Sequence, residues 1–110
     1  MSKDYAVWDI DQILDAYVDE PEFRNNVEVG LTCLFVFLEK NDLLVCRVTN
    51  SGGELVKRVI MDSEITEEGK LLTHGRKNPV QRWLGSKAGQ KNPPDMKMLE
   101  KALAEVRAAS

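Results

Sequence analysis

Residues 27–39 read VEVGLTCLFVFLE, and the conformation of this stretch decides the fold. Alternate residues are apolar, which is typical of a strand, but Val27, Leu31, Leu34 and Leu38 also fall on one face of a helix. Thirteen residues is long for a strand and ordinary for a helix. The length therefore favours a helix, and a strand remains the alternative.

A helix in this stretch would run near residues 26–40. Asn25 or Asn26 could cap its start, and Asn41 could end it in the left-handed conformation. Both ends therefore carry residues that are typical of helix boundaries.

A first helix is predicted near residues 6–20. Its apolar residues recur at spacings of three and four, as on one face of an amphipathic helix: Val7, Ile10, Leu14 and Tyr17. Asp4 or a neighbour caps its start, and Pro21 stops it. The opposite face carries carboxylates at spacings of four, with a further one nearby: Asp11, Asp15, Asp19 and Glu22.

After the central stretch the pattern is that of a β-hairpin. Residues 43–49 and 55–61 are rich in Val, Leu and Ile, and they flank residues 50–54, whose two glycines suit a tight turn. We therefore expect a hairpin across residues 43–61.

Two helices are expected after the hairpin. Thr66 caps the first one, and Pro79 begins a fresh turn. Residues 85–94 have the composition of a flexible loop, and Asp95 caps the last helix. The buried stripe of that helix is formed by Met96, Leu99, Leu103 and Val106. The predicted fold class is α+β, a small single domain over residues 1–110 with two N-terminal helices, a β-hairpin and two C-terminal helices.

Length and composition are those of an ordinary globular domain. The chain has 110 residues, of which 43% are hydrophobic and 30% charged. Its longest apolar run, residues 33–38, is far shorter than the ~20 residues of a membrane span. Residues 1–4 carry no apolar stretch typical of a signal peptide. We therefore expect a cytoplasmic protein that does not associate with membranes.

Few residues could carry catalytic or metal chemistry. Cys33 and Cys46 lie among apolar neighbours and are expected to be reduced, buried thiols. His74 is the one histidine, between glycine and basic residues, and is expected to be a surface-loop or helix-end side chain rather than a catalytic base. Two separated cysteines and one histidine do not supply a zinc site. The sequence thus predicts no enzyme, no metal and no cofactor.

Charge is distributed unevenly along the chain. Residues 1–42 hold ten acidic and three basic residues, a net charge of −7, whereas residues 43–110 hold eight acidic and twelve basic residues, a net charge of +4. Residues 70–91 contain no acid and six bases: Lys70, Arg76, Lys77, Arg82, Lys87 and Lys91. Such an asymmetry bears on binding partners rather than on the fold.

The basic segment, residues 70–91, has two interpretations. Its basic side chains could contact the phosphates along a nucleic-acid backbone while Trp83 stacks on a nucleobase. Alternatively Trp83 belongs to the core with Val80 and Leu84, and the bases are solvated or pair with the acidic first helix. We favour the core assignment for Trp83.

Residues 38–72 resemble the second half of a winged-helix domain. Residues 38–44 are similar to a helix end followed by the first wing strand, residues 50–54 to the wing tip, and residues 65–72 to the capped helix that follows the wing in bacterial regulators. The resemblance implies a DNA-binding scaffold. However, residues 31–39, at the position of the DNA-reading helix, are apolar and contain no basic residue. They are therefore unsuited to reading the edges of nucleobases.

The leading hypothesis is a non-enzymatic protein-binding module that docks a basic protein on Asp11, Asp15, Asp19 and Glu22. Small acidic immunity or antitoxin proteins work in this way, and the likeness is one of size and charge. A merely solvated acidic face is the plain alternative. The second functional hypothesis is a winged-helix-like nucleic-acid-binding domain that uses the basic segment, although nucleic acid is an unfavoured partner for an acidic chain. Self-association into a homo-oligomer is left open.

Overall fold

The decisive stretch is helical. In the computed structural model, which describes residues 4–109, it forms most of α2 (Pro21–Lys40). Leu34 and Leu38 on its buried face have no exposed surface. Pro21 opens this helix, because its fixed φ suits the first helical position, so the expected caps at residues 25 and 26 are wrong. The helix ends where predicted, but Asp42 (φ 59°) rather than Asn41 (φ −99°) takes the left-handed conformation.

The predicted helix near residues 6–20 is wrong at both ends, because residues 6–9 form a strand and the helix ends at Asp15, well before Pro21, which starts the next helix. Residues 6–9 form β1 (Ala6–Asp9), which pairs antiparallel with β2 (Val59–Met61) and places Trp8 opposite Ile60. Helix α1 covers only Ile10–Asp15, and Asp9 rather than Asp4 caps it by accepting a hydrogen bond from the Gln12 N–H at 3.2 Å. The strand β1 leads directly into α1, and the apolar residues of the two elements together have the spacing expected of one longer helix.

The predicted hairpin is confirmed only at its turn. Gly53 has a φ of 81°, its N–H donates to the Asn50 carbonyl, and Thr49 forms a single bridge with Leu55. No ladder extends from this bridge, because the Val48 carbonyl accepts from two successive N–H groups, those of residues 56 and 57. The second arm of the expected hairpin therefore pairs with β1 instead.

Five short elements complete the chain: a 3₁₀ turn η1 (Asp62–Glu64) and the helices α3 (Glu67–Thr73), α4 (Pro79–Leu84), α5 (Lys87–Gln90) and α6 (Lys97–Ala109). The Thr66 cap and the helix start at Pro79 are confirmed. Asp95 accepts from the Lys97 N–H at the start of α6, where Leu99 and Leu103 are buried.

Residues 85–94 are not merely a loop, because they contain α5. Ser86 caps this helix, and Gly89 brings its backbone so close to Trp83 that a β-carbon there would overlap the Trp83 carbonyl. Trp83 itself is fully buried and donates its indole N–H to the Asp95 carbonyl at 2.7 Å. The core assignment of Trp83 is thus confirmed.

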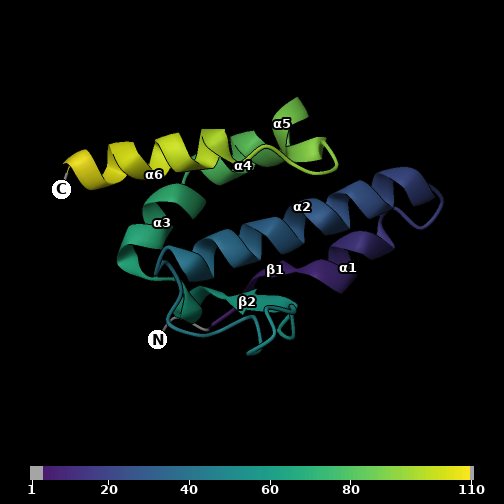
Figure 1. Cartoon of the computed structure of the whole chain (residues 1–110), viewed down its shortest axis with the longest axis horizontal. Coiled ribbons are helices and arrows are strands. Elements are labelled where there is room, and N and C mark those ends of the chain that lie inside the picture. The colour runs from purple at the N-terminus through teal and green to yellow at the C-terminus, as the bar shows by residue number, and fades with distance from the viewer. Residues whose placement is uncertain (1–3, 110) are drawn as a thin grey trace.

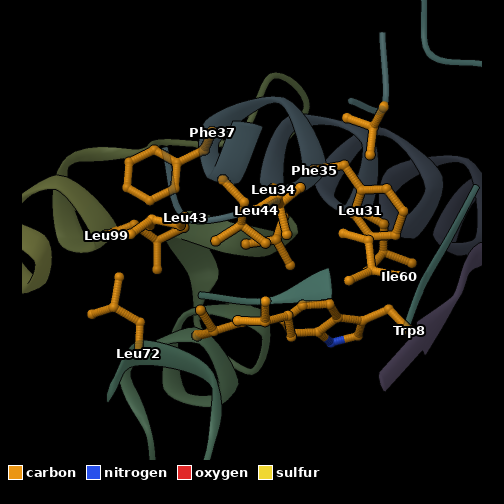
Figure 2. Packing of buried hydrophobic residues seen from close by; sticks show 14 of the residues in the cluster. Trp8, Leu31, Leu34, Phe35, Phe37, Leu43, Leu44, Ile60, Leu72 and Leu99 are labelled. Carbon is orange, nitrogen blue, oxygen red and sulfur yellow. The ribbon is translucent and has the colours of Figure 1, made fainter. Parts of the chain in front are cut away.

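The elements form three levels, with the β1–β2 sheet below α2 and the helices α4 to α6 above it (Figure 1). One apolar cluster joins them: α2 side chains such as Leu31 and Phe35 lie near Trp8 and Ile60 of the sheet at one end of the cluster, and Leu99 of α6 lies at the other end (Figure 2). The mixed α+β class is confirmed. Within residues 4–109, no helix combines the length and the apolarity needed to span a bilayer.

Candidate protein-docking site

Three of the four predicted docking carboxylates surround the corner where α1 passes into α2. Asp15 ends α1, Asp19 lies in the connecting turn, and Glu22 lies in the first turn of α2. All three are exposed, and within residues 4–109 their side chains make no hydrogen bond or ion pair. We call Asp15, Asp19 and Glu22 the acidic corner.

Asp11 has a different role, because it already has an internal partner. The Arg58 side chain donates to Asp11 from Nε at 3.1 Å and lies 2.8 Å from a Glu28 carboxylate oxygen. The hydrogen bonds from these two carboxylates raise the pKa of Arg58. Arg58 thereby connects the chain before β2 with α1 and α2, so we leave Asp11 out of the docking site.

A small aromatic pocket lies beside the acidic corner. The rings of Tyr17 and Phe23 meet edge to face with centroids 5.0 Å apart. They line a cavity of about 180 Å³, in which Asn26 and Gln90 are the polar residues. Ordinary ligand pockets begin at roughly 300 Å³, so this volume suits a single anchoring side chain. Because β1, α1, α2, α4 and α5 all contribute to the wall, no sequence pattern could have shown it.

The basic segment stays separate from the acidic corner. Lys70 lies 3.8 Å from Asp62, whereas its other five bases, Arg76, Lys77, Arg82, Lys87 and Lys91, are exposed. Among the described residues none of these bases pairs with the first helix, so the internal-pairing interpretation is wrong. Stacking of Trp83 on a nucleic-acid base is also excluded in this fold, since the ring is fully buried.

His74 takes part in a cluster that the sequence analysis missed. His74 lies at the end of α3, as predicted for a helix-end side chain, but its ring is half-buried: Nδ1 lies 2.7 Å from the Thr73 hydroxyl and Nε2 lies 2.6 Å from Asp62. The hydrogen bond with His74 is the main reason why the pKa of Asp62 is lowered. An adjacent Thr-His pair with an Asp some distance before it is too common a pattern to have indicated this cluster.

The order hydroxyl, imidazole, carboxylate is also that of a nucleophilic triad, but the details favour a structural role. Thr73 is only 8% exposed, and its hydroxyl donates to the Gly69 carbonyl at 3.1 Å. A hydroxyl that is buried and bound in this way is poorly placed to attack a substrate. The cluster instead ties the end of α3 to η1.

The cysteines are free thiols, as predicted, but both are half-buried rather than fully buried. Burial raises the pKa of both, that of Cys46 to about 11, so they are protonated near neutral pH and weak nucleophiles. In the part of the chain that the structure describes, no three His, Cys, Asp or Glu side chains converge as a metal site.

Comparisons with protein-family models, with curated proteins and with solved structures found no match to this chain. The winged-helix resemblance of residues 38–72 therefore stays a prediction.

Proposed function

We propose that the protein is a non-enzymatic protein-binding module that docks a basic partner on the acidic corner, as small acidic immunity or antitoxin proteins do. One observation carries the proposal: three exposed carboxylates without internal partners in the described residues lie one or two positions along the chain from Tyr17 or Phe23, whose rings line a pocket of about 180 Å³.

The two parts of the site have different physical tasks. Exposed carboxylates attract a basic partner over roughly a Debye length, about 10 Å at 0.1 M salt, and so raise the association rate. A pocket that encloses one side chain holds the partner after contact, because a few buried anchors carry most of the binding free energy. Tyr17 and Phe23 could also face a cationic side chain with their rings.

The test is an NMR titration with two probes, a lysine-rich peptide that carries one phenylalanine and the same peptide with serine in its place. The phenylalanine peptide should shift the amides of Tyr17, Asn26 and Gln90 and bind about tenfold more tightly, since burying an aromatic side chain contributes about 1.5–3 kcal/mol. Affinity for both peptides should fall as salt is added.

Other outcomes would contradict the proposal. Shifts that avoid the corner with both peptides would remove it as the docking site. The nucleic-acid hypothesis instead predicts binding at the basic segment, and a titration with single-stranded DNA tests it. Tight, salt-resistant DNA binding with shifts over residues 76–91 would replace the proposal with the second hypothesis.

A further inference from the structure

A second, larger groove runs between α2 and α6 and plays no part in the acidic corner. Its volume is about 690 Å³, and its inner surface is mostly apolar, formed by Cys33, Val36, Phe37, Met96, Leu103 and Ala104. Helices α2 and α6 run toward the same side of the molecule (Figure 1), and the Arg107 guanidinium joins their far ends by donating to the Asn41 carbonyl at 2.6 Å. The groove is therefore a trough along two helices, fixed at one end.

Charged side chains mark the two ends of this trough differently. Lys40 and Arg107 line one end, and Glu100 lies seven residues before Arg107 on α6. Seven residues of helix span roughly 10 Å. Arg107 is held by Glu68 at 2.9 Å, whereas the side chain of Lys40 makes no ion pair within residues 4–109. The positive charge of Lys40 is thus available to bind a carboxylate from a second molecule.

The groove face of α6 is complementary to itself. Leu103 and Ala104 lie midway between Glu100 and Arg107. If a second α6 packs antiparallel with these two residues at the centre, Glu100 of each copy meets the Lys40 and Arg107 end of the other. A two-fold interface has this property, because one surface patch must match itself.

We infer that the α2–α6 groove receives α6 of a second copy of this chain, in a two-fold antiparallel pair. Ala104 is exposed and small, so the two helices can approach closely at the crossing point. The apolar groove walls are covered by the same contact. Because α6 is only about 20 Å long, the interface is short, and the dimer should belong to the weak, concentration-dependent class.

The experiment is sedimentation equilibrium of the full chain from about 1 µM to 1 mM, the range that covers weak association. The wild type should shift from monomer to dimer within it. Ala104→Arg should weaken the dimer at least tenfold, since a large side chain at the centre overpacks both copies. Ala109→Arg, which adds the same side chain to an exposed position outside the groove, is the matched control and should dimerise like the wild type.

A charge exchange tests the register. Glu100→Lys should weaken the dimer about tenfold. The new lysine then faces Lys40 and Arg107 of the other copy, and this repulsion occurs at both ends of the two-fold interface. Adding Lys40→Glu should restore it. A wild type that stays monomeric to about 1 mM would overturn the inference. So would a dimer that survives both Ala104→Arg and Glu100→Lys in variants whose circular dichroism shows an intact fold.

Discussion

Carboxylates serve two different purposes in this protein. Many of them bind internal partners, and four of these are called the paired carboxylates: Asp11, Glu39, Asp62 and Glu64. The acidic corner carries the same kinds of side chain without partners in the described residues. The paired carboxylates fix loops and helix ends, whereas the corner has no structural task and its charges are available to a binding partner.

Internal contacts lower the pKa of three paired carboxylates, Glu39, Asp62 and Glu64. The pKa values of Glu39 and Asp62 are lowered chiefly by hydrogen bonds from Thr49 and His74. For Glu64, burial works in the opposite direction, but the Met61 N–H and Lys57 outweigh it and the pKa is still lowered. Neutralising a paired carboxylate should therefore affect stability, and neutralising the corner should affect binding.

A substitution in the buried core should lower the unfolding free energy more than a substitution in either group of carboxylates. Trp83→Ala removes a fully buried ring together with its bond to the Asp95 carbonyl. The expected loss is about 3–5 kcal/mol of unfolding free energy, measured by urea denaturation. A loss under about 1 kcal/mol, the range of surface substitutions, would show that the ring contributes little to the core.

Glu39 should have the largest effect among the paired carboxylates. It accepts from the Thr49 hydroxyl at 2.7 Å and from the N–H of Val48, a fully buried residue. Glu39→Ala leaves that N–H without a partner, which should cost about 1–3 kcal/mol. Glu22→Ala at the corner is the control and should stay within about 0.5 kcal/mol of the wild type. Equal losses would abolish the distinction between the two groups.

Asp62 should show its effect as a dependence on pH. Because its folded-state pKa is lowered, its carboxylate stabilises the fold above pH 3.8, the ordinary value, and this contribution is lost as the pH falls through the folded pKa. The difference in unfolding free energy between wild type and Asp62→Asn should therefore shrink as the pH falls below 3.8. Asp15→Asn is the control for an exposed carboxylate and should stay within about 0.5 kcal/mol of the wild type near neutral pH. An Asp62→Asn difference that persists unchanged into strong acid would refute this account of the His74 contact.

Arg58 should matter less, since solvent screens its ion pairs. Its side chain is 34% exposed, and those of Asp11 and Glu28 are 70% and 39% exposed. Arg58→Ala should cost roughly 1 kcal/mol or less. The control is Arg24→Ala, an exposed position on α2. A loss above roughly 2 kcal/mol in the urea denaturation of Arg58→Ala would mean that the connection is structurally as important as a buried contact.

Local signals predicted the local parts of the fold. The Thr66 cap, the helix start at Pro79 and the turn at Gly53 each depend on a few neighbouring residues, and all three are present. The strand β1 could not be predicted in this way, since its partner Ile60 lies some fifty residues away and the spacing of Val7 and Ile10 also suits a helix.

The candidate site follows the same rule. The corner carboxylates are exposed, as predicted, but they do not share one helix face, because Asp19 lies in the turn after α1 and Glu22 lies in α2. The Arg58–Asp11 contact joins positions 47 residues apart, and nothing in either neighbourhood indicates it. The helix α5 depends on the approach of Gly89 to Trp83, which a glycine-rich segment does not reveal before folding.

The most direct measurement of the central claim is the association rate of the phenylalanine-bearing, lysine-rich peptide at low salt. Two variants with the same net charge are compared. One neutralises the acidic corner by Asp15→Asn, Asp19→Asn and Glu22→Gln. The other neutralises three exposed carboxylates elsewhere by Glu54→Gln, Glu67→Gln and Glu105→Gln.

Docking at the corner predicts that the first variant associates about tenfold more slowly than wild type, with a smaller change for the second. Both variants should keep the stability of the wild type. Equal slowing of the two would mean that only net charge matters, and it would contradict a docking site at the corner.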